Sequence, residues 1–175
     1  MILRNPACTR TGVLVALVIT LGFGLGGCSL MIMQPEGQTA ASADKGSPAT
    51  PVDKVLSVAR AQLDSPYQYG AAGPEAFDCS GLVYYSYLQA GITLPRTALA
   101  QYSHTAPVSA DALEPGDLVF FRLGDSRVSH VGIYEGGRAF IHAPSTGSRV
   151  MSGSLDNRYW RERWVRGGRI SVASP

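Results

Sequence analysis

The spacing of apolar residues changes once along this chain, near Pro115-Gly116, and this change limits the folds open to it. Before that point, apolar residues recur every three or four positions and predict three helices. The first runs from Thr50-Pro51 to before Ser65-Pro66 and has Leu63 on its buried face. The second runs from about Cys79 to Ala90, and a short third helix reaches about Tyr102. After it, short apolar runs bounded by turn residues predict strands at 117–121, 128–134, 138–143, near Val150 and at 163–170. This order predicts an α+β domain in which N-terminal helices pack on an antiparallel β-sheet.

The first 27 residues have the character of an export signal. Arg4 and Arg10 precede an apolar run from Val13 to Leu25, which is short for a membrane-spanning helix and typical of a signal peptide. The run ends in Leu25-Gly26-Gly27-Cys28, which resembles a bacterial lipobox, whose cysteine is acylated and becomes the first residue. We therefore predict a lipoprotein signal peptide over residues 1–27 and lipidation at Cys28. An ordinary signal peptide and an uncleaved anchor are the alternatives.

The segment after Cys28 is poor in large apolar residues and rich in small and polar ones, so residues 28–50 are predicted to form a flexible tether. Residues 51–175 are predicted to form one folded domain. Ser29 stands where inner-membrane lipoproteins usually carry aspartate. By that sorting rule, we expect a lipid-anchored protein of a Gram-negative outer membrane, facing the periplasm.

Removal of the signal would leave a chain without net charge. The sequence has 15 Lys and Arg against 13 Asp and Glu, and residues 1–27 contain Arg4 and Arg10 but no acid. No broad basic field remains, so nucleic acid is not an expected partner. Six arginines gather late in the chain, and we expect them to lie on a solvated face: Arg149, Arg158, Arg161, Arg163, Arg166 and Arg169.

Cys79 is predicted to be the one free thiol, because Cys8 would leave with the signal and Cys28 would carry lipid. An exported chain can use such a thiol as an inert core residue, in an intermolecular bridge or as a reactive group. Asp78 directly precedes Cys79 and is a good helix cap. A helix start and a nearby imidazolium both lower the pKa of a thiol, so this position is suited to a nucleophile.

His130 and His142 lie in the two strands of one predicted hairpin. If they are directly opposite each other, with an index sum of 272, they share a sheet face and the connection is Glu135-Gly136-Gly137. A two-residue Gly136-Gly137 turn would give a sum of 273 and opposite faces. The sequence permits both registers.

In the first register the two histidines could serve Cys79. His130 would accept the thiol proton and His142 would orient its ring, as in a Cys-His protease. The Cys79 backbone N–H and Tyr67 are candidate donors to an oxyanion. A zinc site of Cys79, His130 and His142 is an alternative, but it offers three ligands without close-paired spacing. We therefore expect neither a metal nor a cofactor, and we expect His104 to lie on the surface.

Seven segments, in order, resemble the NlpC/P60 family of cell-wall peptidases: Tyr67-x-Tyr-Gly, Phe77-Asp-Cys-Ser-Gly-Leu-Val, Gly91-x-x-Leu-Pro-Arg, Gln101, Pro115-Gly-Asp-Leu-Val-Phe-Phe, Ser129-His-Val-Gly-Ile-Tyr and Phe140-Ile-His-Ala. The resemblance covers nearly all of 51–170. It implies a papain-like fold with Cys79 as nucleophile, His130 as base, His142 as the third polar residue and Tyr67 beside the site. Ala71 departs from the family, which often has a second glycine there, and no wall-binding repeat is visible.

The resemblance also implies a substrate class, namely peptide bonds of peptidoglycan stem peptides or cross-links (D-Glu–diaminopimelate or D-Ala–diaminopimelate). Asp78 and Ser80 flank the thiol and could contact a stem-peptide amine. Peptidoglycan and, through the lipid, the membrane are the expected partners of a monomeric chain. Two alternatives remain: an N-acetylmuramoyl-L-alanine amidase, as in CHAP-type relatives, and a non-catalytic cell-wall-binding lipoprotein.

Overall fold

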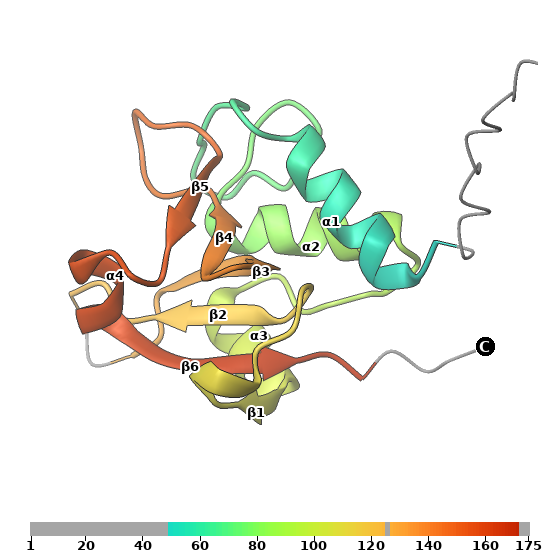
Figure 1. Cartoon of the computed structure of the whole chain (residues 1–175). Coiled ribbons are helices and arrows are strands. Elements are labelled where there is room, and N and C mark those ends of the chain that lie inside the picture. The colour runs from blue at the N-terminus through green and yellow to red at the C-terminus, as the bar shows by residue number, and fades with distance from the viewer. Residues whose placement is uncertain (1–48, 125–126, 172–175) are drawn as a thin grey trace, which may run out of the picture. The chain divides into compact units, whose positions relative to one another are not determined.

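A computed structural model describes residues 49–124 and 127–171 (Figure 1). The predicted signal peptide, Cys28 and nearly all of the predicted tether lie outside these residues. The described part of the chain contains the helices α1 (Pro51–Ala61), α2 (Cys79–Gln89), α3 (Ala98–His104) and α4 (Arg158–Arg163), with a 3-10 turn at Ala110–Ala112. None of these helices has the length and apolar character needed to cross a membrane.

Six strands form one antiparallel sheet in the order β1-β6-β2-β3-β4-β5. They are β1 (Ala106–Val108), β2 (Leu118–Phe121), β3 (His130–Gly136), β4 (Ala139–His142), β5 (Met151–Ser154) and β6 (Trp164–Arg169). The predicted α+β class with an antiparallel sheet is confirmed. Two elements were not predicted from the sequence: the short β1, which contains Pro107, and α4, which begins at the Asn157 cap within the arginine-rich segment.

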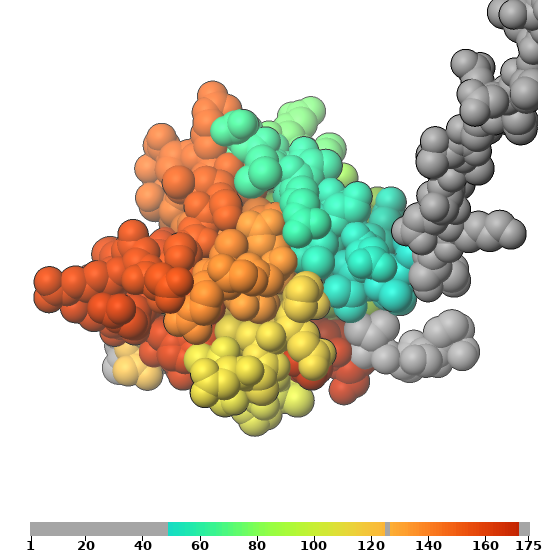
Figure 2. All heavy atoms as spheres, viewed as in Figure 1, coloured from blue at the N-terminus to red at the C-terminus, as the bar shows by residue number. Residues whose placement is uncertain are grey.

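Apolar side chains cover both faces of the sheet, which explains the uninterrupted apolar sequence of β2. Leu118 and Phe120 point into a core shared with α1 and α2, whereas Val119 and Phe121 belong to a second cluster with Trp160 of α4. A strand buried on both faces shows no polar alternation. In the space-filling view, α1 lies against the strands on one side, and the segment around α4 stands out at the other end (Figure 2).

The two N-terminal helices begin where their caps predict. Thr50 and Asp53 form a reciprocal capping box at α1, and the Asp78 carboxylate accepts a hydrogen bond from the N–H of Gly81 in the first turn of α2. The prediction that α1 buries Leu63 is wrong, because the helix ends at Ala61 and Leu63 is 42% exposed.

The late arginines do not form a simple solvated face, so that expectation is wrong for two of them. Arg169 of β6 binds the buried carboxylate of Asp117 through two nitrogens, each at 2.8 Å. The Arg166 guanidinium lies 3.9 Å from the centre of the Tyr102 ring. Both therefore hold β6 to its neighbours.

Gly81 lets α2 approach the preceding loop closely. A Cβ at this position would overlap the backbone carbonyl of Ala71. We expect Gly81→Ala to lower the free energy of unfolding by about 3 kcal/mol, because backbone must move to accommodate the methyl group. Urea unfolding would measure this. Ser86→Ala on the same helix is the matched control and should cost under about 1 kcal/mol, since the buried Ser86 hydroxyl has no hydrogen-bond partner among the described residues. Equal costs for the two variants would contradict this explanation.

Candidate active site

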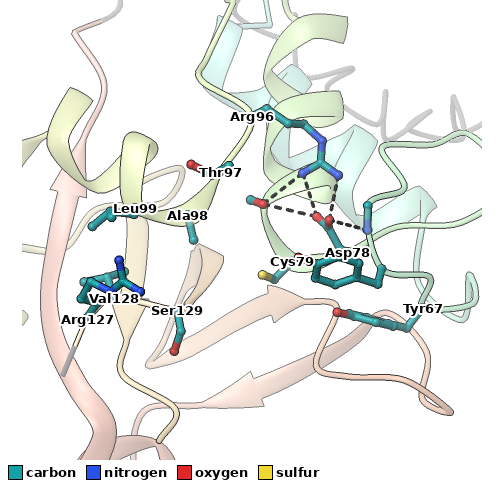
Figure 3. A pocket seen from close by; sticks show the side chains of 13 residues that line it. Tyr67, Asp78, Cys79, Arg96, Thr97, Ala98, Leu99, Arg127, Val128 and Ser129 are labelled. Atoms are coloured by element: carbon teal, nitrogen blue, oxygen red, sulfur yellow. Dashed lines mark hydrogen bonds and ion pairs between the residues drawn. The ribbon is translucent and has the colours of Figure 1, made fainter. Parts of the chain in front are cut away.

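Cys79 is the first residue of α2 and opens onto a cleft of about 640 Å³ (Figure 3). The side chain is half-buried and packs against the first core cluster. The cleft is lined by Tyr67, Tyr69, Gly70, Asp78, Cys79, Ser80, Arg96, Thr97, Ala98, Leu99, Arg127, Val128 and Ser129. Four of the predicted site residues (Tyr67, Asp78, Cys79 and Ser80) therefore share one cavity.

The pKa of the Cys79 thiol is raised, contrary to the lowering expected from its place at a helix start. Burial raises the pKa of Cys79, and the negative charge of Asp78 raises it further. The backbone N–H groups of Val131, Ser80 and Cys79 itself lower the pKa, but by less. A nucleophile at this position therefore needs a base that removes the proton as the sulfur attacks. The thiol lies beside the backbone of Val131, which directly follows His130.

The Asp78 carboxylate is fully engaged by this chain. It forms a two-pronged ion pair with Arg96, at 2.7 and 2.9 Å, and accepts hydrogen bonds from the N–H groups of Gly70 and Gly81 and from the Ser80 hydroxyl. Burial acts to raise the pKa of Asp78, but the hydrogen bonds from Arg96, Gly81 and Gly70 together with the positive charge of Arg96 outweigh it, so the pKa lies below its ordinary value. A carboxylate offers about four lone-pair positions. Asp78 is thus well suited to position the start of α2, and has little capacity left for a substrate amine.

Arg96 is a site residue that the sequence analysis did not single out. Its guanidinium also donates to the Ser80 hydroxyl at 3.0 Å and to the Ala71 carbonyl at 3.0 Å, so it ties the loop before α2 to the residues around Cys79. The Gln101 side chain secures the same corner by donating to the carbonyls of Ser80 and Pro95. The sequence signal for Arg96 is Leu94-Pro95-Arg96, which belongs to one of the segments that resemble the NlpC/P60 family.

His130 and His142 share a sheet face, but in neither of the two registers that the sequence permits. His130 Nε2 and His142 Nδ1 are 2.9 Å apart, so the two rings are hydrogen-bonded. Neither of the two index sums considered, 272 and 273, is present, since Tyr134 is paired with Phe140 and the sum is 274. Extending this register places His142 opposite Gly132, where a side chain would overlap the Phe140 ring and crowd His142. The histidines are diagonal neighbours, and a shift of two residues preserves the face.

A turn and a bulge together produce this register. The turn residues are Gly137 and Arg138, with φ of +57° and +68°, which is typical of a two-residue type I′ hairpin turn. That turn pairs Gly136 with Ala139 and alone would put the histidines on opposite faces. Glu135 is then an extra residue in β3, a β-bulge that restores the shared face.

Trp160 of α4 covers the histidine pair, a contact that the sequence analysis did not foresee. Its ring stacks on that of His130, with centroids 5.3 Å apart and planes at 22°, and meets the His142 ring edge-on at 4.7 Å. Phe121 and Phe140 complete the surroundings. Both histidines are only 2% exposed, so their hydrogen bond is sheltered from water.

Burial in this cluster keeps both histidines neutral. It lowers the pKa of His130 to about 3, with a further contribution from His142, and lowers the pKa of His142 to about 4. In the unfolded chain the pKa of histidine is about 6.5. At pH values below the unfolded pKa of about 6.5 and above the folded pKa values, the unfolded state therefore binds more protons than the folded state. The folding stability falls as the pH drops from about 6.5 towards 4.

We expect this acid sensitivity to depend on the histidine pair. Below pH 6.5 each histidine should add a slope of about 1.4 kcal/mol per pH unit to the loss of folding stability. Urea unfolding between pH 7.5 and 4 would measure the slope for the unaltered chain and for His142→Gln, which retains a polar group but does not titrate. The variant should show the smaller slope, and identical slopes would contradict a buried neutral pair.

Tyr67 lies at the rim of the cleft beside the loop between β4 and β5, where its backbone N–H donates to the Ser148 carbonyl at 3.0 Å. Burial raises the pKa of Tyr67, and the charges of Cys79 and Asp78 raise it further. The phenol is therefore a proton donor at neutral pH, as a role in oxyanion stabilisation requires.

The Cys79 thiol meets the backbone N–H of Val131, which directly follows His130, but Cys79 packs against the first core cluster, whereas the two histidine rings pack with Phe121, Phe140 and Trp160 of the second. Among the described residues, Cys79 has no hydrogen bond to either ring. Ser129 lines the cleft, and the chain passes from it directly into buried His130. The described residues contain no group of three or more His, Cys, Asp or Glu side chains placed to hold a metal ion. His104 ends α3 and is exposed, as expected.

Comparison with known proteins agrees with this arrangement. The model of the NlpC/P60 family matches residues 64–169. A probable endopeptidase p60 of Listeria seeligeri is 42% identical over 116 residues, covering 66% of this chain and 22% of that protein. The murein DD-endopeptidase MepH of Escherichia coli is 38% identical over 137 residues, covering 75% of this chain and 51% of MepH. The chain thus spans about half or less of the length of these two relatives.

Solved structures show the same fold. A lipoprotein-like NLP/P60 family protein of Staphylococcus aureus matches with a TM-score of 0.64 and 35% identity, over 75% of this chain and 45% of that one. The NlpC/p60 domain of the peptidoglycan hydrolase SagA matches with a TM-score of 0.61 and 29% identity, over 68% of this chain and 98% of that domain.

Proposed function

This chain belongs to the NlpC/P60 family, and from that premise we propose that it is a cysteine endopeptidase that cuts peptide bonds of peptidoglycan. The observation that carries the proposal is a thiol at a helix start, open to a cleft and met by the backbone N–H of Val131, together with a buried, hydrogen-bonded histidine pair whose first member, His130, directly precedes Val131. Relatives named as murein endopeptidase and peptidoglycan hydrolase support this substrate class.

His130 is the proposed base. If its Nε2–H donates to Nδ1 of His142, Nδ1 of His130 carries no proton and can accept one. His142 holds the ring of His130 in this tautomer, and Trp160 protects the hydrogen bond from water. Because the thiol and both imidazoles are neutral at rest, the proton passes from sulfur to His130 as the bond to the substrate carbonyl carbon forms.

The remaining steps follow from this assignment. The oxyanion of the tetrahedral intermediate accepts hydrogen bonds from the Cys79 N–H and the protonated Tyr67 phenol. His130 then returns its proton to the departing amine, leaving a thioester on Cys79. Water, deprotonated by His130, hydrolyses the thioester and restores the thiol. Asp78 and Arg96 act by positioning the first turn of α2.

Digestion of purified sacculi tests the proposal. The full chain in detergent should release fragments whose masses correspond to cleavage within stem peptides or cross-links, at D-Glu–diaminopimelate or D-Ala–diaminopimelate. Intact stem peptides free of sugar would instead indicate an amidase. No new fragments with the unaltered chain would favour a non-catalytic wall-binding protein.

We also propose that the chain is anchored by lipid at Cys28 to the periplasmic side of an outer membrane. The support is the sequence alone: a basic start, an apolar run, Leu25-Gly26-Gly27-Cys28 and Ser29. In membrane fractionation of a Gram-negative host, the unaltered protein should sediment with the outer membrane. Cys28→Ser should lose the mass of the acyl groups and leave that fraction. Retention of the variant there would contradict the proposed anchor.

A further inference from the structure

The charges that line the cleft are not balanced. Among its lining residues that the structure describes, Asp78, Arg96 and Arg127 are charged. Asp78 and Arg96 neutralise each other through their two-pronged ion pair. The third charge, on Arg127, has no acidic counterpart among these residues. Within the described lining, Arg127 is therefore the charged side chain that stands apart from the Asp78–Arg96 ion pair.

Arg127 belongs to a different side of the cleft from the Asp78–Arg96 pair (Figure 3). In that view Tyr67 and Asp78 lie to one side of Cys79, and Arg127 lies to the other with Val128, Ser129 and Leu99. Arg127 is exposed, and Leu99 is 42% exposed. This side thus combines an apolar surface with one guanidinium, a group that matches a carboxylate in shape and charge.

We propose that Arg127 determines specificity by binding the free carboxylate of a diaminopimelate residue on the amine side of the scissile bond. This inference rests on the proposed function. The two candidate bonds have different acyl residues, D-glutamate and D-alanine, but both have diaminopimelate on the amine side. In both bonds the diaminopimelate residue has a free carboxylate that is not part of either of its two main-chain amides. Lysine in the same place has no such carboxylate.

The effect should be moderate, because an exposed guanidinium is screened by water. A charge-assisted hydrogen bond in a partly open cleft corresponds to about a tenfold preference. We therefore expect the unaltered chain to hydrolyse a diaminopimelate substrate about ten times more efficiently, in kcat/KM, than an otherwise identical lysine substrate.

The experiment compares three synthetic cross-linked stem-peptide dimers, each containing both candidate bonds. One has diaminopimelate, one has diaminopimelate with this carboxylate converted to a carboxamide, and one has lysine. The full chain is assayed in detergent by mass-resolved product formation. In Arg127→Gln the roughly tenfold preference for the free carboxylate should shrink to nearly one. The preference should persist in Arg122→Gln, the matched control, because exposed Arg122 precedes the same loop but does not line the cleft.

The outcomes separate this inference from the proposed function. If the unaltered chain cuts all three dimers equally, or if Arg127→Gln keeps the full preference, the inference is wrong and the hydrolase assignment stands. A fourth dimer has the free carboxylate of D-glutamate converted to a carboxamide. If Arg127→Gln removes a preference for the free D-glutamate carboxylate over this carboxamide, Arg127 binds the acyl residue and the inference is equally overturned. If the unaltered chain cuts none of the dimers and releases nothing from sacculi, the proposed function itself fails.

Discussion

Cys79→Ala is expected to abolish peptidoglycan hydrolysis while leaving the domain folded. The thiol supplies the atom that would form the thioester, and no other described cysteine could replace it. Loss of a covalent nucleophile typically reduces kcat by about 10⁴-fold or more. The structural cost should be small, about 1 kcal/mol, because one half-buried sulfur is removed and neither the Asp78 cap nor its bonds to Arg96 depend on it.

The measurement pairs turnover of sacculi with thermal unfolding of the same preparation. Cys79→Ser is the matched comparison, since it keeps a polar group of similar size but has an oxygen that this neutral histidine pair would activate poorly. Both variants should be inactive and should unfold within a few degrees of the unaltered chain. Full activity in Cys79→Ala would eliminate the proposed mechanism.

Replacement of His130 should have the second largest effect. Removing a general base typically costs about 10²- to 10⁴-fold in rate. His130→Ala would also leave a cavity beneath Trp160 and beside Phe121, at a cost of about 3 kcal/mol, so this variant alone could lose activity by unfolding. His130→Gln is the sharper test, because the amide fills most of the space and can still donate to Nδ1 of His142.

The comparison with His142→Gln distinguishes a base from an orienting group. Glutamine at 142 can accept from Nε2–H of His130, so the tautomer is retained and the rate should fall only about tenfold, or about 1.4 kcal/mol in activation free energy. Single-turnover rates of all three variants, measured on samples whose circular dichroism matches the unaltered chain, would decide. If His130→Gln lost no more activity than His142→Gln, His130 would not be the base.

The sequence was sufficient for features that depend on neighbouring residues. The Thr50–Asp53 capping box, the start of α2 at Cys79 and the strand content after Pro115 are all found in the structure. Caps and turns act over three or four residues, and the alternation of side chains along a strand is a local property. The end of α1 was misjudged because it does not depend on local spacing alone. Leu63 fits the helical spacing, but its exposure depends on which residues pack against it.

The histidine register required more than local information. Both registers considered from the sequence were wrong, because neither included a bulge at Glu135 followed by a turn at Gly137-Arg138. A bulge depends on the pairing of β3 with β4 and on the packing of both faces. The two histidines share a face, as the catalytic hypothesis required, but they pack with Phe121 and Phe140, whereas Cys79 packs against the core cluster on the other side of the sheet.

The sequence by itself determined the candidate nucleophile, the histidines and the family, since these depend on residue types in a fixed order. Only the tertiary structure decided how they are arranged. It brought Arg96 to Asp78 across 18 positions, Trp160 onto the histidine pair and Arg127 to the far side of the cleft. It also reversed the expected shift in the pKa of Cys79, because desolvation comes from residues distant in sequence and here outweighs the local effect of the helix start.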